Sequence, residues 1–198
     1  MLTQEELEIG FRVYFNEMQR CESNRCYWSL LHLLIILPDV CSALENEDGE
    51  SRKERYKDWC ARYLATPKLS AVEWYEVRCI LLHQGRTLPQ KLGEPKGRYA
   101  RYSFSQPRLN GEEAHQEVQT VDGKTQINLD VDKMMQEVWA AIVAWFHEIA
   151  AGKIPDKARH VEKNISTVSN VAQRGQETVK GFTVIESLPA IRYTTSSP

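Results

Sequence analysis

The chain has 198 residues, of which 42% are hydrophobic and 26% are charged. A chain of this length can bury a full core as one domain, so neither disulfides nor a structural metal are needed for folding. The 25 basic and 27 acidic residues give a net charge of −2, so overall charge does not indicate a nucleic-acid-binding protein and any such site must come from local clustering.

The cysteines do not form a disulfide framework or a familiar metal site. They are odd in number, and no two have Cys-x-x-Cys spacing: Cys21, Cys26, Cys41, Cys60 and Cys79. A free thiol in an apolar helical pattern behaves as a small hydrophobic group. Cys21, Cys26 and His32 lack the spacing of a known zinc module. We therefore expect no bound metal, no cofactor and a reducing compartment.

The sequence shows no export or membrane signal. Residues 1–7 are acidic and polar, unlike a signal peptide. The most apolar run, residues 27–37, is shorter than the roughly 20 residues that span a bilayer. It contains His32 and ends at Pro38. We expect a buried core helix, no membrane association and a cytoplasmic location.

Two helices are predicted in the first 45 residues. The first begins after Thr3, which forms a capping box with Glu6 and precedes apolar residues at helical spacing. The second runs from about residue 24 into the mid-forties and is apolar nearly all round, which places it at the centre of a bundle. Pro38 is expected to kink this helix or divide it in two.

Two further helices follow. One covers about residues 51–65, with Tyr56, Trp59, Cys60 and Tyr63 facing inward. The other opens at Ser70, where Glu73 completes a capping box, and ends at Gly85, a typical left-handed C-cap residue. We interpret Glu73 as a cap and Glu76 as part of a solvated helix face.

A β-hairpin and a long helix come next. Residues 117–121 and 125–129 flank an Asp122-Gly123 turn, which predicts a hairpin, and residues 99–104 predict a further strand beside it. The long helix starts at the Asp130 cap. Its apolar residues form a seam with alternating spacings of four and three: Val131, Met135, Val138, Ile142, Trp145 and Ile149. We favour docking of this seam into the bundle over a dimer contact.

The elements together predict a mainly α fold, an up-and-down helical bundle with a small β-hairpin insertion at about 98–129 before the last long helix. The predicted domain covers residues 1–155. Residues 156–198 are rich in polar side chains and are predicted to be a C-terminal tail that the bundle does not need. The apolar residues able to dock this tail are Phe182, Val184, Ile185, Leu188 and Ile191.

The fourth helix carries the most unusual residue. On a helical wheel Arg78 falls in the middle of a sector formed by Trp74, Leu81 and other apolar side chains. An arginine there is costly unless its charge is paired or faces an interface. His83 lies about 140° round and about 7.5 Å further along the same helix.

This segment resembles the HEPN family of helical-bundle ribonucleases and nucleotide-binding domains. Four residues separate Arg78 from His83, near the end of a helix that closes with glycine, as in the Arg-x4-His signature. Residues 37–41 and 59–64 are similar to uncharacterised bacterial proteins that share this arrangement. The resemblance covers roughly the first half of the chain.

The resemblance implies metal-independent cleavage of RNA at a homodimer interface, by a toxin or a phage-defence protein. In that mechanism His83 transfers protons during attack by the 2′-hydroxyl and Arg78 holds the scissile phosphate. Both roles suit the side chains, since histidine titrates near neutrality and arginine is a permanent forked cation. The resemblance also implies an antitoxin or a nucleotidyltransferase as a partner.

One departure favours a non-catalytic alternative. Active members usually carry a polar residue, often Asn, directly after the arginine, whereas this chain has Cys79, a poor hydrogen-bond donor. The alternative is a HEPN-like module that binds a nucleotide, RNA or a protein partner. In a purely structural role, Arg78 would form a buried salt bridge to Asp39 or Glu45. His83 would then be a cation that stabilises the helix dipole.

A basic and aromatic segment follows the fourth helix. Residues 86–108 hold six basic residues against the single acid Glu94, with two tyrosines and a phenylalanine among them. Such a segment can follow a phosphate backbone and stack on bases, or it can be a solvated loop whose aromatic residues pack on the bundle. The residues predicted to contact RNA are Arg86, Lys96, Arg98 and Arg101.

Overall fold

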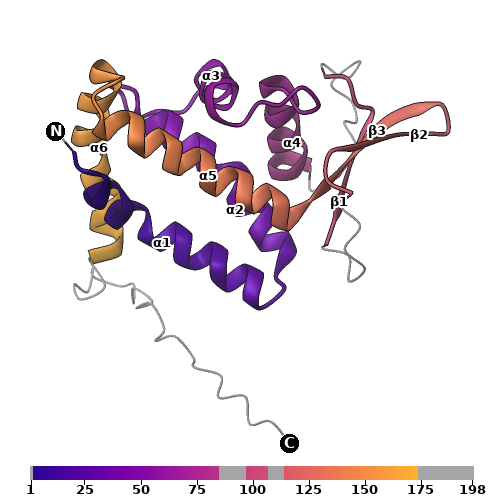
Figure 1. Cartoon of the computed structure of the whole chain (residues 1–198), viewed down its shortest axis with the longest axis horizontal. Helices are drawn as coiled ribbons and strands as arrows, with labels where there is room; N and C mark the ends of the chain where they lie inside the picture. The colour runs from indigo at the N-terminus through magenta and orange to yellow at the C-terminus, as the bar shows by residue number, and fades with distance from the viewer. Residues whose placement is uncertain (1, 85–96, 107–113, 174–198) are drawn as a thin grey trace, which may run out of the picture.

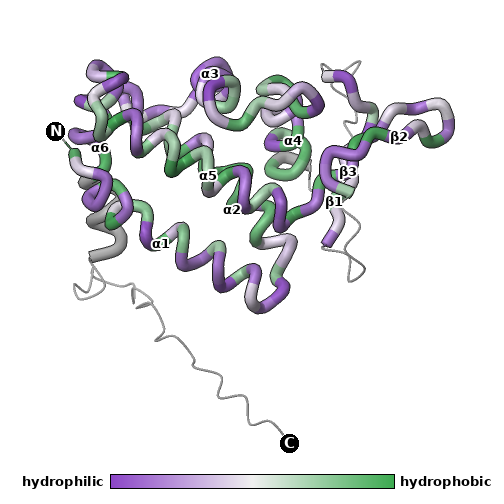
Figure 2. The backbone as a smooth tube through the Cα atoms, viewed as in Figure 1, coloured by the Kyte–Doolittle hydropathy of each residue, from purple (hydrophilic) through white to green (hydrophobic). Residues whose placement is uncertain are grey.

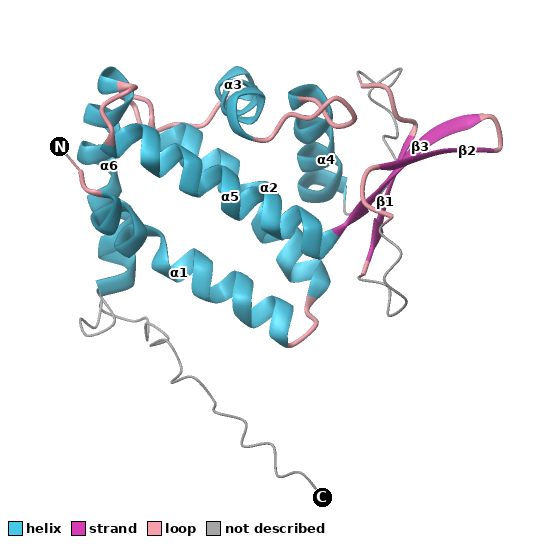
Figure 3. Ribbon diagram, in the orientation of Figure 1, coloured by secondary structure: helices cyan, strands magenta, loops and turns pink. Residues whose placement is uncertain are grey.

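The computed structural model describes residues 2–84, 97–106 and 114–173, and this part of the chain is mainly helical with one small sheet (Figures 1 and 3). The helices are α1 (Gln4–Ser23), α2 (Tyr27–Leu44), α3 (Lys53–Tyr63), α4 (Ala71–Gln84), α5 (Val131–Ala150) and α6 (Pro155–Gln173). The strands are β1 (Arg101–Ser105), β2 (Glu117–Val121) and β3 (Lys124–Asp130).

The helices surround α2 and α5, which pack on each other. Both contact α1 and α6, and α2 also contacts α3 and α4. Hydrophobic residues concentrate along α2, α4 and α5 (Figure 2). The sheet lies at one end of the helical part and α6 at the other (Figure 1). The mainly helical fold with a small sheet insertion is thus confirmed.

Local signals place the start of α1 correctly. The Thr3 hydroxyl accepts a hydrogen bond from the backbone N–H of Glu6 at 3.2 Å, and the Glu6 carboxylate accepts one from the backbone N–H of Thr3 at 2.8 Å. These two bonds form the predicted capping box and satisfy backbone donors that the first helical turn leaves free.

The helix α2 is the central element of the bundle, as its composition predicts. It continues through Pro38 as a single helix, so the chain is not divided there. By length and apolar composition it is the one helix of the described residues that could cross a bilayer, but half of it is buried inside the fold. Burial of this kind is what a core helix requires.

The predicted seam of α5 docks into the bundle. All six seam residues are buried, and Trp145 and Phe146 make edge-on contacts with the ring of Phe11 on α1, at centroid distances of 5.8 and 5.2 Å. Aromatic pairs in this geometry add to the free energy gained by burying their area. The preference for bundle packing over a dimer seam is therefore confirmed.

The predicted hairpin and additional strand are also present. β2 pairs antiparallel with β3 across the Asp122-Gly123 turn, whose residues have φ angles of 51° and 71°, and β1 pairs with β3 in parallel. The strand order is β1-β3-β2. β3 runs directly into α5 at Asp130, where the side chain caps the helix by accepting a hydrogen bond from the N–H of Lys133 at 3.0 Å.

The end of the chain departs from the predicted polar tail. Residues 155–173 form α6, which buries Ala158, Val161 and Ile165 and packs against α1. Gly10 allows this approach, since a Cβ there would lie 2.9 Å from the Ile165 side chain. The bundle therefore extends beyond residue 155, and residues 174–198, with the apolar positions from Phe182 to Ile191, lie outside the described part of the chain.

Candidate functional site

Arg78 forms an ion pair with Asp39. Its Nε–H donates to the Asp39 Oδ2, which connects α4 to α2, and the side chains of the two residues are 21% and 17% exposed. The sequence offered Asp39 or Glu45 as the partner in a structural role, and the structure selects Asp39. The positive charge in the apolar sector of α4 is thus neutralised within the chain.

Two tyrosine rings flank the guanidinium of Arg78. Its Cζ lies 5.5 Å from the centroid of Tyr56 and 5.7 Å from that of Tyr75, and the two rings contact each other edge-on at 5.7 Å. Burial by itself would lower the pKa of Arg78, but the hydrogen bond and the charge of Asp39 outweigh it and raise the pKa. The ion pair is therefore held firmly in its charged form.

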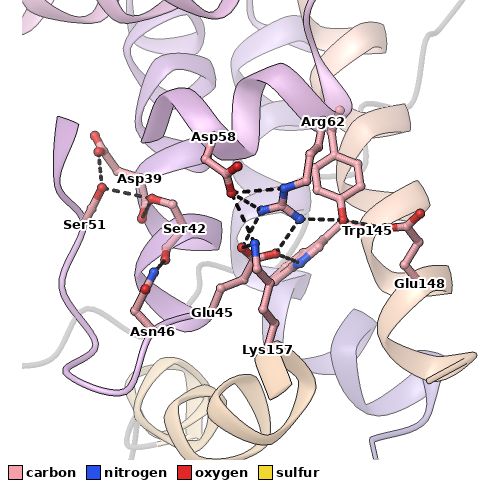
Figure 4. Close-up of polar contacts among 11 residues, drawn as sticks. Asp39, Ser42, Glu45, Asn46, Ser51, Asp58, Arg62, Trp145, Glu148 and Lys157 are labelled. Carbon is pink, nitrogen blue, oxygen red and sulfur yellow. Dashed lines mark hydrogen bonds and ion pairs between the residues drawn. The ribbon is translucent and has the colours of Figure 1, made fainter. Parts of the chain in front are cut away.

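The second carboxylate oxygen of Asp39 binds the end of the loop that leads to α3. The Ser51 hydroxyl donates to Oδ1 at 2.7 Å, and the hydroxyls of Ser51 and Ser42 lie 3.0 Å apart (Figure 4). Asp39 is consequently fixed on both oxygens, by α4 on one side and by this loop on the other. Its orientation does not depend on Arg78 alone.

Glu45, the other expected partner of Arg78, belongs to a separate network at the end of α2. Its buried carboxylate accepts bonds from both terminal nitrogens of Arg62, from the Nζ of Lys157 at 3.0 Å and from the indole N–H of Trp145 at 2.8 Å (Figure 4). These donors come from α3, α6 and α5, respectively. The network therefore joins four helices and compensates its own charges.

His83 belongs to the last turn of α4, five residues after Arg78, and its side chain lies outside the described residues. Of the predicted catalytic pair, the structure thus describes the side chain of Arg78 alone. In the described part of the chain no group of three or more His, Cys, Asp or Glu side chains is placed to hold a metal ion.

The predicted RNA-contacting arginines occupy different environments. The guanidinium of Arg98 binds the Glu73 carboxylate through Nε at 2.7 Å and Nη2 at 2.9 Å, and its Nη1 donates to the carbonyl of Pro67 at 2.8 Å. Arg101 is exposed on β1. Arg86 and Lys96 lie outside the described residues. Of these four residues, the structure thus describes Arg98, which is bound to α4, and Arg101, which is exposed.

Glu73 and Glu76 together bind the segment that leads into β1 to α4. Glu73 caps the helix by accepting from the Ser70 N–H at 2.6 Å, in addition to its bonds with Arg98. Glu76 accepts from the Tyr102 hydroxyl at 2.6 Å and the Gly97 N–H at 2.9 Å. The interpretation of Glu76 as a solvated residue is wrong, because Glu76 is half-buried and its carboxylate is bound by two donors from a segment more than twenty residues further along the chain.

The exposed side of α2 is mainly apolar, with the exposed Ser29 and the half-buried His32 among its apolar residues, and the sequence did not single it out as a site. It carries Trp28, which is 53% exposed, and Ile36, which is 36% exposed, with Leu33 and Val40 half-buried beside them. We call these four residues the α2 outer face. The only Asp, Glu, Lys or Arg in α2 is Asp39, whose charge Arg78 neutralises. A helix face with so little charge is unusual on a protein surface.

Comparison of the chain with protein-family models, with curated proteins and with solved structures gives no match.

Proposed function

We propose that this chain is a non-catalytic, HEPN-like helical module that binds a partner protein through the α2 outer face in the cytoplasm. The ion pair between Arg78 and Asp39 is the observation that carries the proposal. It turns the arginine of the Arg-x4-His signature into a neutral bridge between two helices. Cys79, in place of the polar residue of active members, points in the same direction.

The ion pair makes Arg78 a poor phosphate ligand. A phosphate that approaches the guanidinium also meets the carboxylate of Asp39, whose negative charge opposes that of the phosphate. The Nε–H of Arg78 already donates to Asp39, so a phosphate that took this donor would strand a half-buried carboxylate. The geometry therefore favours a structural role for the pair.

The α2 outer face suits a partner with an apolar and uncharged contact surface. Binding would bury the 53% of Trp28 and the 36% of Ile36 that solvent still reaches, and so would gain a part of the about 1.5–3 kcal/mol that complete burial of a large apolar side chain contributes. A charged partner surface would lose its hydration against this face without gaining an opposite charge. Aromatic anchors such as Trp28 are typical of the energetically important positions in protein interfaces.

A metal-independent endoribonuclease, acting as a toxin or in phage defence, is the second candidate. It is favoured by the placement of Arg78 and His83 in the last two turns of one helix, and by the part of the Arg78 side chain that solvent still reaches. In this candidate α4 lies near the twofold axis of a homodimer, and an antitoxin or a nucleotidyltransferase is the associated protein. Two copies would supply an acid and a base.

An RNA cleavage assay separates the two candidates. We expect wild-type protein to cut no RNA, Arg78→Ala to lower the free energy of unfolding, and His83→Ala to change it by less than about 1 kcal/mol. Cleavage that is lost in both variants while the fold is retained would overturn the non-catalytic proposal. Products with 2′,3′-cyclic phosphate ends and insensitivity to chelators would then identify the ribonuclease.

A photo-crosslinking residue placed at position 36 tests the binding face directly. We expect it to give one adduct of defined mass in cells, which Trp28→Glu abolishes. The same residue at Val13, which is 43% exposed on α1, is the matched control and should give none. Equal adducts at both positions would contradict a specific role for the α2 outer face.

A further inference from the structure

The strand β2 has an edge that is open in the described structure. It is last in the strand order β1-β3-β2 and pairs only with β3 among the described residues. All five of its residues are exposed, including Val118 at 44% and Val121 at 38%. An exposed edge of this kind presents a row of backbone donors and acceptors to another strand.

The sequence of β2 protects this edge little. Proteins usually block an exposed edge with charged residues, above all lysine, or with proline, a bulge or a covering loop. The residues of β2, Glu-Val-Gln-Thr-Val, include no lysine, proline or glycine, their one charged residue is the first, and three of the five are β-branched. The hairpin also projects away from the helices, which leaves room for a second chain beside it (Figure 1).

We propose that β2 pairs antiparallel with β2 of a second copy of this chain, so that the two three-stranded sheets form one six-stranded sheet. The twofold axis passes beside Gln119, which lies opposite its own copy. In this register Val118 faces Thr120 of the second copy, and Glu117 faces Val121. Antiparallel pairing of identical strands is isologous, and it therefore closes as a dimer.

Charge complementarity supports this register. Within one chain Val121 lies opposite Lys124 on β3. In the dimer Glu117 of the second copy lies on the other side of Val121, so the carboxylate and the ammonium flank it on one face of the sheet. Their backbones are two strand spacings apart, about 10 Å, and the two long side chains can reach toward each other over the valine. Like charges do not face each other within β2.

Both faces of the joined sheet are compatible with pairing. On one face Gln119 extends the row that begins at Gln126, its neighbour on β3, so that four glutamine side chains line up across the axis. On the other face Val118 continues from the buried Ile127, its partner on β3. Pairing places the methyl group of Thr120 from the second copy beside Val118, which extends the apolar side of the sheet.

This dimer is independent of the α2 outer face and of catalysis. It would carry two copies of that face, which makes binding to a partner with two sites bivalent. The ribonuclease candidate, in contrast, brings α4 and not β2 to the twofold axis. The location of the self-contact therefore separates this inference from the proposals above.

Two variants that place opposite charges at position 119 provide the test. We expect full-length wild-type protein to sediment as a dimer at micromolar concentration. Gln119→Lys and Gln119→Glu should each be monomeric, because like charges then meet on the axis, and an equal mixture of the two should restore a dimer. Val13→Lys, an equally exposed change on α1, should remain a dimer. A monomeric wild type, or dimers that persist in both Gln119 variants, would overturn the proposal.

Cysteine cross-linking tests the register itself in a Cys26→Ser background. Gln119→Cys should form a disulfide with its own copy under mild oxidation, because facing Cα atoms lie within the range that a disulfide bridges. Glu117→Cys should not, since the two copies of residue 117 are offset by about 13 Å along the strands. A mixture of Glu117→Cys and Val121→Cys proteins should cross-link. Self-linkage at 117 but not at 119 would contradict this register.

Discussion

Asp39 and Arg78 lie 39 positions apart in the sequence, and their ion pair joins the central helix α2 to α4 at the boundary between core and solvent. A second bond to Ser51 fixes the same carboxylate from the loop before α3. The pair therefore determines how three segments of the first half of the chain meet.

Removing either partner should destabilise the protein, and Asp39→Ala also removes the acceptor of the Ser51 hydroxyl. Arg78→Ala and Asp39→Ala should each lower the free energy of unfolding by about 1–3 kcal/mol, between the values for exposed and buried ion pairs. The double variant should lose less free energy of unfolding than the sum of the two single losses, because neither charge is then left without its partner. Urea denaturation of the four proteins measures this coupling. Strictly additive losses would mean that the pair does not contribute as a unit.

The buried carboxylate of Glu45 should be more important for stability than its exposed neighbour Asp58. Glu45→Ala leaves the donors of Arg62, Lys157 and Trp145 without their common acceptor, and should cost about 2–4 kcal/mol. Asp58 binds the same two cations but its side chain is 59% exposed, so Asp58→Asn should cost less than about 1 kcal/mol. Chemical denaturation compares the two variants. A similar loss in both would show that burial does not set the difference.

Truncation should distinguish α6 from the residues that follow it. A chain that ends at Gln173 should melt like the full-length protein. A chain that ends at Lys153 loses the buried Val161 and Ile165 and the Lys157 bond to Glu45, and should lose about 3 kcal/mol or more. Differential scanning calorimetry measures both. If the shorter chain melts at the same temperature, α6 is not an integral part of the bundle.

The protein should become less stable in acid, because the Glu73 carboxylate is then protonated. Burial alone would raise the pKa of this carboxyl, but hydrogen bonds from Arg98 and Ser70 outweigh burial and lower the pKa from 4.5 to about 2. Because the pKa is lower in the folded state, the contribution of Glu73 to the free energy of unfolding is complete above about pH 5 and is lost as the pH falls from 4.5 toward 2.

The matching measurement is urea denaturation at pH 7 and at pH 3. Between these values wild-type protein should lose about 1–2 kcal/mol more than Glu73→Gln, a figure reduced for the half-exposed Arg98 side chain. Glu17→Gln, at an exposed position on α1, is the control and should follow the wild type. If the difference between Glu73→Gln and wild type is the same at both pH values, the Glu73 contact does not titrate in this range.

Features set by neighbouring residues could be predicted from the sequence. The capping box of Thr3 and Glu6 and the Asp122-Gly123 turn depend on a few adjacent positions. The central place of α2 follows from its apolar composition, and the buried side of α5 follows from its seam. In each case the local preference and the tertiary structure agree, so the pattern is sufficient.

Features set by distant residues could not be predicted in the same way. The helix α6 has few apolar residues, and its burial depends on Gly10, more than 150 positions earlier, allowing Ile165 to approach α1. The partners of Glu76 and the parallel pairing of β1 with β3 also come from separate segments. For Arg78, charge alone identified two candidate carboxylates, and only the packing of α2 against α4 selected Asp39.

The tip of the hairpin offers a practical attachment point for studying this protein in cells. A Cβ built on Gly123 would meet no atom within 4 Å, and Asp122 and Gly123 are both exposed. A short reporter or epitope inserted between them would extend into solvent. Exposed turns of this kind usually tolerate insertions. The chain can thus be labelled internally, with both of its ends left unaltered.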